Sequence, residues 1–133
     1  MEGKHLAVIP ETHMDLFTRP VVVALATVQP DGQPQVTPIW ADIEDGRIRI
    51  NTAAGRQKWK NLIERPQATV MALDPEDPFH WIEIRGVVAS HTEEGGDDVI
   101  NQLSHKYTGK DYTFTPGETR VTFFIEPTRV VTS

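Results

Sequence analysis

Hydrophobic positions in the first third of the chain recur with the spacing of β-strands. Residues 21–28 form an almost continuous run of apolar, mostly β-branched residues, which predicts a central strand buried on both faces. A proline and an Asp-Gly pair follow over 29–32, so the strand predicted over 35–43 returns antiparallel as a hairpin. Because Pro38 has no backbone N–H to donate, we expect this second strand to be interrupted, bulged or at a sheet edge there.

The pattern continues with further strands and short helices. A turn over 44–46 leads into 47–52, where strict alternation predicts a half-buried strand, and apolar residues at i, i+3 and i+4 predict an amphipathic helix over 55–65. The remaining expected elements are a buried strand over 68–73, a loop over 74–78, a strand over 79–90 with a bend at Gly86, a helix over 93–106, a loop over 107–118, and a last strand from Val121 past Pro127 to Val131. Six or seven antiparallel strands with short helices predict a mainly β fold of the α+β or closed β-barrel class.

Length, charge and composition narrow the classes of protein to consider. A chain of 133 residues suits one domain, which we expect to span residues 1–133. With 13 basic and 19 acidic residues the net charge is -6, which disfavours nucleic acids and anionic membranes as partners. The absence of cysteine excludes disulfides, thiolate zinc sites and cysteine nucleophiles. Neither a signal peptide nor an apolar run of about 18 residues is seen, so we expect a cytoplasmic protein without membrane contact.

One segment of this acidic chain is strongly basic. Residues 47–65 hold six cations against the single carboxylate of Glu64, a net +5 that leaves -11 for the rest of the chain: Arg47, Arg49, Arg56, Lys58, Lys60 and Arg65. Arg56 and Lys58 fall in the first turn of the predicted helix, where the helix dipole is already positive. That placement becomes favourable when an anion binds the free N–H groups beside the Thr52 hydroxyl. We therefore predict a phosphate site at this strand-to-helix junction; the alternative interpretation is an ordinary solvated helix face.

Other candidate groups point to no further chemistry. The histidines show no spacing that would gather two of them on one helix face or strand edge, so we expect no metal site: His5, His13, His80, His91 and His105. Ser90 and Ser104 each precede a histidine, but sequence neighbours do not place a hydroxyl against an imidazole nitrogen, and no G-x-S-x-G motif occurs. Trp40 and Trp59 we interpret as packing residues.

Several motifs follow one another in an order and spacing typical of one family. They are LATVQPDG at 25–32, PQVTPIW at 34–40, NTA at 51–53 with Gly55, Arg56 and Lys58, NL at 61–62, ALDP at 72–75, IEIRG at 82–86 and SHKYTG at 104–109. Together, over roughly residues 10–131, they resemble the pyridoxamine 5′-phosphate oxidase-like superfamily. Within it, they are most similar to the F420-dependent (deazaflavin) reductases of the split-barrel B group.

The resemblance implies a fold and a set of binding residues. The fold is a six-stranded antiparallel split barrel of the FMN-binding type, which forms a homodimer with its cofactor sites at the subunit interface. The implied cofactor-binding residues are Thr52, Ala53, Arg56 and Lys58 for the phosphate, Gln35, Val36, Thr37 and Pro38 for the ring, Asn51 at the junction, and Trp81 and Lys106 from the partner subunit. No catalytic side chain is implied, because the cofactor itself carries the hydride.

The implied function is hydride transfer between reduced F420 and a small unsaturated or conjugated acceptor. Two alternatives stay open: an FMN-dependent oxidase or reductase of the pyridoxamine-phosphate-oxidase type, and a non-catalytic F420 carrier. The phosphodiester and acidic tail of F420 suit the basic segment better than the single phosphate of FMN. F420 is therefore the expected cofactor.

Overall fold

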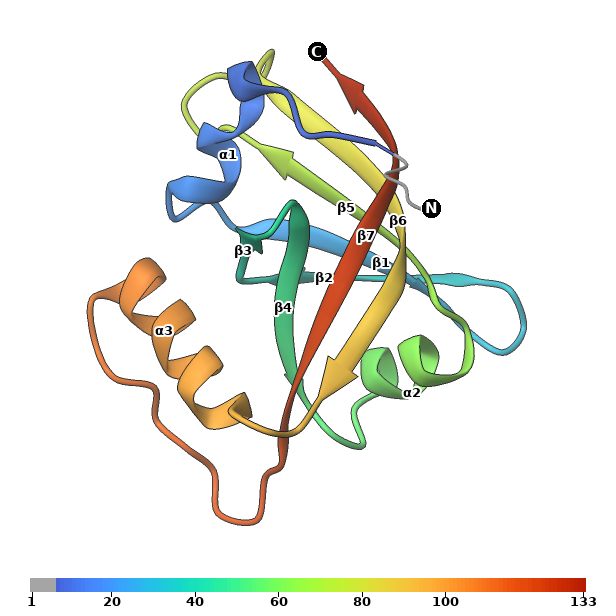
Figure 1. Ribbon diagram of the computed structural model, residues 1–133, viewed down its shortest axis with the longest axis vertical. Helices are drawn as coiled ribbons and strands as arrows, with labels where there is room; N and C mark the ends of the chain where they lie inside the picture. The colour runs from blue at the N-terminus through green and yellow to red at the C-terminus, as the bar shows by residue number, and fades with distance from the viewer. Residues whose placement is uncertain (1–6) are drawn as a thin grey trace.

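A curled antiparallel sheet organises the part of the chain that the computed structural model describes, residues 7–133 (Figure 1). His5 lies outside the described residues. The sheet has seven strands in the order β2-β1-β5-β6-β7-β4-β3. The strands are β1 Val23–Val28, β2 Pro34–Ile39, β3 Ala41–Glu44, β4 Arg47–Ala53, β5 Gln67–Leu73, β6 Trp81–Thr92 and β7 Arg120–Thr132. The mainly β fold class predicted from the pattern is confirmed.

The seventh strand arises because one predicted strand is divided. Trp40 alone separates β2 from β3, yet β2 pairs with β1 and β3 pairs with β4. These two strands are the opposite edges of the sheet, so one chain segment joins both edges and the sheet curls into a split barrel. Pro38 lies opposite Ala24 on the edge strand β2, the kind of strand in which proline is tolerated within a sheet. The predicted edge position is confirmed, and the interruption falls two residues further on, at Trp40.

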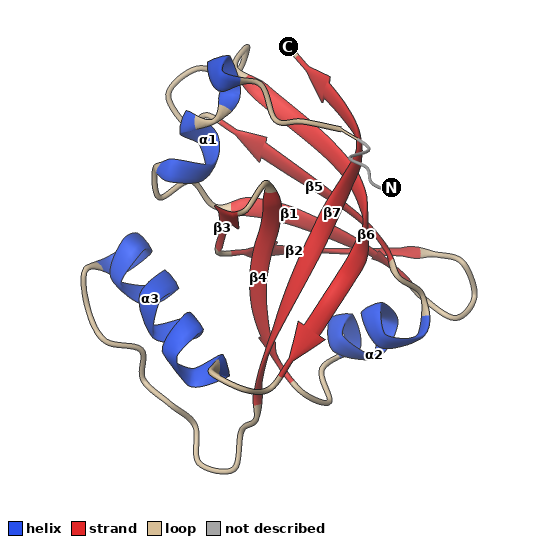
Figure 2. Ribbon diagram, viewed as in Figure 1, coloured by secondary structure: helices blue, strands red, loops and turns tan. Residues whose placement is uncertain are grey.

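Four short helices lie outside the sheet in the described residues (Figure 2). They are η1 Glu11–His13, α1 Asp15–Thr18, α2 Gln57–Glu64 and α3 Gly96–Thr108. The two predicted helices are confirmed as α2 and α3, with α3 beginning at Gly96 because Gly95 supplies a left-handed residue at its N-terminus. The segments η1 and α1 were not predicted, since three or four residues are too few to show a helical period. None of the helices over residues 7–133 has the length and apolar character needed to cross a membrane.

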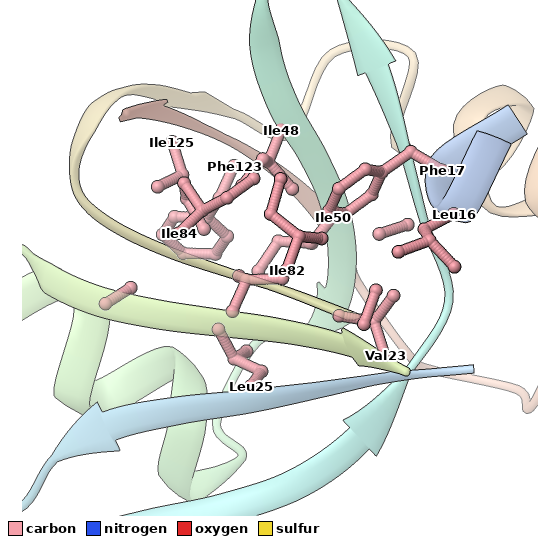
Figure 3. Packing of buried hydrophobic residues seen from close by; sticks show 14 of the residues in the cluster. Leu16, Phe17, Val23, Leu25, Ile48, Ile50, Ile82, Ile84, Phe123 and Ile125 are labelled. Carbon is pink, nitrogen blue, oxygen red and sulfur yellow. The ribbon is translucent and has the colours of Figure 1, made fainter. Parts of the chain in front are cut away.

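The hydrophobic core fills the inside of the curled sheet. Side chains from β1, β4, β6, β7 and α1 point toward one another there, as Figure 3 shows for Leu25, Ile50, Ile84 and Phe123. The bend predicted at Gly86 is confirmed as a register shift between β6 and β7, and a Cβ at this position would lie 2.5 Å from the Glu126 carbonyl oxygen. Glycine is therefore required for the close approach of these two strands.

The outer face of β1 is less covered than its sequence predicts. Strand β1 is central, between β2 and β5, but only its inner residues are fully buried and its outer residues are half-buried. Directly opposite the outer residue Ala24 lie Pro38 on β2 and Met71 on β5, which share its face. Val22 and Val36 nearby are 56% and 62% exposed. The prediction that both faces of β1 are buried was therefore wrong for this chain alone, and an apolar outer face remains uncovered.

Candidate functional site

A cavity of about 340 Å³ lies beside the junction of β4 and α2. One part of its wall is apolar and comes from Val22, Pro38, Ile39, Trp40 and Ile100. The other part is polar and comes from Asn51, Thr52, Arg56, Lys58, Tyr112 and Arg120. Such a cavity suits a ligand with an apolar body and an anionic end.

The polar part of the cavity wall forms at the connection between strand β4 and helix α2. Ala53, the last residue of β4, lies opposite Arg120 on β7, and the Ala54 N–H donates to the Thr119 carbonyl over 2.8 Å. Gly55, with φ of +95°, then turns the chain into the helix. Arg56 is the N-cap residue of α2, and no side chain in residues 7–133 caps that helix end. The uncapped N-terminus leaves backbone N–H groups available to an anion.

Thr52 is the first sign that this junction is incomplete without a ligand. Its side chain is buried, at 2% exposure, and its hydroxyl has no hydrogen-bond partner among the described residues. Leaving a buried hydroxyl unpaired costs about 1–3 kcal/mol. A ligand oxygen in the adjoining cavity would satisfy it.

Lys58 is the second sign. It lies half-buried in the cavity wall, and within the described part of the chain no carboxylate forms an ion pair with it. Burial lowers the pKa of Lys58 below its ordinary value, and the positive charges of Arg56 and Arg120 lower it further. An unpaired, partly desolvated cation among other cations is unfavourable until an anion binds. The Thr52 hydroxyl and the Lys58 ammonium thus fit a phosphate group.

Phosphate-ligand binding should therefore weaken as the pH rises. Only protonated Lys58 attracts the anion, and because its pKa in the free protein is lowered, deprotonation begins at a lower pH than for an ordinary lysine. The bound anion raises this pKa again, so the dissociation constant should increase as the pH passes through the free-protein value. Titrations with FMN from about pH 7 to about pH 9.5 test this, since the ligand phosphate has already ionised there.

The matched variant for this titration is Lys58→Met, which lacks the titrating group. Any pH dependence due to the ligand itself is common to both proteins. The wild type should lose more affinity than the variant between the two ends of the range. Equal slopes in the two proteins would show that Lys58 does not contact the anion.

Residues 9–132 match the family model of pyridoxamine 5′-phosphate oxidase. The chain belongs to the pyridoxamine 5′-phosphate oxidase family. The predicted resemblance to that superfamily is confirmed, and so is the split-barrel fold, with the extra strand explained by the break at Trp40.

Solved structures of similar proteins agree with the family. An F420 reductase is 30% identical and superposes with a TM-score of 0.84, covering 92% of this chain and 98% of its own. A conserved hypothetical protein from Mycobacterium tuberculosis is 26% identical, with a TM-score of 0.71 and coverage of 99% and 89%. HupZ from group A Streptococcus, 18% identical with a TM-score of 0.68 and 94% coverage of each chain, shares the fold. A search of the curated proteins found no match.

Five residues that the family resemblance assigns to the cofactor line the same cavity in this family member. They are Pro38, Asn51, Thr52, Arg56 and Lys58. Ala53 is buried directly after Thr52 at the end of β4. The remaining ring residues, 35–37, belong to β2 but do not line the cavity of this chain. Strand β2 therefore reaches the cavity only at its last residues.

Trp81 and Lys106 do not line this cavity. Trp81 begins β6 opposite Leu73, on the uncovered outer face of the sheet. Lys106 lies in α3, and its ammonium donates hydrogen bonds to the carbonyl oxygens of Phe17 and, over 2.6 Å, Ala41. In this chain Lys106 therefore links α3 to α1 and β3.

The basic segment 47–65 does not form one cluster. Only Arg56 and Lys58 of its six cations line the cavity. The others are engaged elsewhere or exposed: Arg47 pairs with Glu126 at 2.9 Å, Arg49 with Asp42 at 2.6 Å, Arg65 donates to the Val28 carbonyl over 2.7 Å, and Lys60 is exposed. The preference for F420 over FMN rested on six cations acting together, and only two of the six lie at the cavity. The charge of the segment therefore gives little support to F420 over FMN.

Arg120 supplies the third cation of the cavity and was missed by the sequence analysis. It is 5% exposed, and its guanidinium donates to the Asn51 side-chain oxygen over 2.8 Å and to the Tyr112 hydroxyl over 3.2 Å. Asn51 in turn donates to the Gly96 carbonyl over 2.9 Å, so β4, β7 and α3 meet at this network. The sequence feature that could have indicated Arg120 is its position as a charged residue at the start of a hydrophobic strand.

A second group of polar side chains lies at the other end of the barrel. Asp15, Asp74 and His80 are close enough to suggest a metal site, but Arg19 donates to both carboxylates over 3.1 Å. The pKa of Asp74 is lowered chiefly by the hydrogen bond it accepts from Arg19, and the pKa of Asp15 chiefly by the hydrogen bond it accepts from His80. The guanidinium thus supplies the positive charge that a metal would bring, and the group ties α1 to the loop after β5.

Proposed function

We propose that the protein is an oxidoreductase that binds coenzyme F420 and transfers a hydride between the reduced cofactor and a small unsaturated or conjugated acceptor. The observation that carries this proposal is that the Thr52 hydroxyl has no hydrogen-bond partner and Lys58 no ion-pair partner among residues 7–133, and that both line a cavity with an apolar part to its wall. The similarity to an F420 reductase, at 30% identity over most of both chains, supports F420 as the cofactor.

The residues of this chain bind and orient the cofactor. Thr52, Arg56, Lys58 and Arg120 would hold its phosphate at the start of α2. Trp40, stacked on Tyr107 with ring centroids 5.4 Å apart, presents a fixed apolar surface to the ring system. When bound, the deazaflavin supplies the hydride chemistry, so the protein needs to provide position, electrostatics and exclusion of water.

We further propose that two copies of the chain associate through the uncovered outer face of the sheet. Val22 and Pro38 belong both to this face and to the cavity wall, so a second copy seated on the face would border the cavity. Trp81 lies on the same face, where it would meet the partner. Apolar surface of this kind favours association. Sedimentation velocity measures the mass in solution, and a monomer at micromolar concentration would contradict this arrangement.

An FMN-dependent oxidase or reductase is the second candidate, and one observation favours it. Three cations line the cavity, Arg56, Lys58 and Arg120, which is a set sufficient for a single phosphate group. The other four cations of the basic segment 47–65 do not line the cavity and so add nothing to these three. Among residues 7–133 the acidic tail of F420 therefore finds no additional cluster of cations at the cavity, and a direct binding measurement decides between the two cofactors.

Parallel titration of the purified protein with F420 and FMN tests the proposal. Tight binding of F420, followed by reoxidation of reduced F420 in the presence of conjugated acceptors, is the expected result. Tight binding of FMN alone would establish the second candidate. Bound F420 that no acceptor reoxidises would instead indicate a carrier protein. Binding of neither cofactor would overturn the assignment of the cavity.

A further inference from the structure

Glu118 places a negative charge against the cations of the proposed phosphate site. It lies in the loop that leads from α3 into β7 (Figure 1), and its side chain is 10% exposed. One carboxylate oxygen is 3.1 Å from an Arg120 guanidinium nitrogen, and the other is 3.5 Å from an Arg56 guanidinium nitrogen. A single, largely buried carboxylate thus pairs with two of the three cations at the cavity.

The two arginines depend on Glu118 to different extents. Arg120 is buried and is also held by Asn51 and Tyr112, so its position is fixed by several hydrogen bonds. Arg56 has an exposed side chain, and Glu118 is its one ion-pair partner among residues 7–133, at a distance too long for a strong hydrogen bond. The contact with Arg56 is therefore the one that a stronger anion can replace.

We propose that Glu118 is an internal competitor for the phosphate site and so determines which anions occupy it. In the free protein its carboxylate pairs with Arg56; a ligand phosphate takes over that pairing while Arg120 stays in place. A small inorganic anion gains little from this exchange, because it replaces one anionic contact with another. A ligand whose apolar body also fills the cavity gains further binding free energy from that contact. Occupancy of the site therefore depends on the whole cofactor and not on its phosphate alone.

This inference rests on the proposed phosphate site. It predicts an effect on anion binding opposite in sign to the effect expected if Glu118 only held the arginines in position. If Glu118 competes, its neutralisation tightens anion binding; if it only orients the arginines, neutralisation weakens binding. Glu118→Gln separates the two, because the amide oxygen can still accept from Arg120 while the negative charge is removed. Glu94→Gln is the matched control, since Glu94 is exposed, lies in the nearby bend before α3 and does not line the cavity.

The experiment measures dissociation constants of inorganic phosphate, FMN and F420, and melting temperatures with and without each. In Glu118→Gln we expect each ligand that binds wild type to bind about three- to tenfold more tightly, by a similar factor for all of them because each displaces the same carboxylate. The free variant should melt at a lower temperature, because the Arg120 guanidinium loses its counter-charge, and the ligand-induced rise should be larger than in wild type. The control should match wild type in both readouts.

Two results overturn the inference in distinguishable ways. If wild type binds a phosphate ligand and Glu118→Gln binds it equally or more weakly, Glu118 is not a competitor, while the proposed function stands. If neither protein binds any of the three ligands, the phosphate site itself is wrong and both proposals fall.

Discussion

Replacement of Lys58 by methionine is expected to weaken cofactor binding by about 1 to 3 kcal/mol while leaving the fold intact. The loss reflects a charge-assisted contact with the ligand phosphate, and every 1.4 kcal/mol corresponds to roughly a tenfold change in affinity. Stability should not fall, because Lys58 forms no ion pair in the described chain and its cation is already unfavourable there. Methionine also retains an apolar stem against the cavity wall.

Lys60→Met on the same helix provides the control for Lys58→Met. Lys60 is exposed and does not line the cavity, yet its replacement changes the net charge of the protein equally. Fluorescence titration gives the dissociation constants, and thermal unfolding compares the stabilities. Equal affinities for Lys58→Met and Lys60→Met would mean that the basic residues of α2 form a solvated helix face.

The strands and their hairpins could be predicted because their signals are local. The turns at 29–32 and 44–46 contain Asp-Gly pairs, and both connect the antiparallel neighbours that the sequence predicts. The break at Trp40 could not be placed, since it depends on which partner each half of the strand finds in the closed barrel. Burial of the outer face of β1 was overestimated for a similar reason: apolar residues indicate contact, without saying whether the covering surface belongs to the same chain.

Part of the candidate site could be predicted from the local positive charge and the helix dipole alone. Thr52, Arg56 and Lys58 lie within seven consecutive residues, so a local argument was enough to bring them together. Arg120 and Glu118 come from a distant segment, which reaches the site because β7 pairs with β4. The same cross-strand pairing removes cations from the site, as it places Arg47 beside Glu126. A count of charges along the sequence contains no information about such partners.

The substitution with the largest expected effect on the fold is Gly96→Ala at the start of α3. A Cβ at this position would overlap the carbonyl oxygen of Arg120 and lie 2.8 Å from its carbonyl carbon. Alanine favours a helix by about 1 kcal/mol over glycine, but the overlap is with backbone of β7, which cannot rotate away as a side chain can. We therefore expect the free energy of unfolding to fall by about 3 kcal/mol or more.

The same substitution should also damage the phosphate site, because it displaces a residue that forms it. The Arg120 backbone must move away from α3, and Asn51, which donates to the Gly96 carbonyl and accepts from Arg120, couples the displacement to β4. Denaturant unfolding measures the stability, and FMN titration of the remaining folded protein measures the affinity. Gly95→Asn is the control: Gly95 has open space around its Cα and a φ of +72°, which asparagine tolerates, so both quantities should stay close to wild type. A Gly96→Ala protein as stable as this control would contradict the close approach of α3 to β7 on which the position of Arg120 depends.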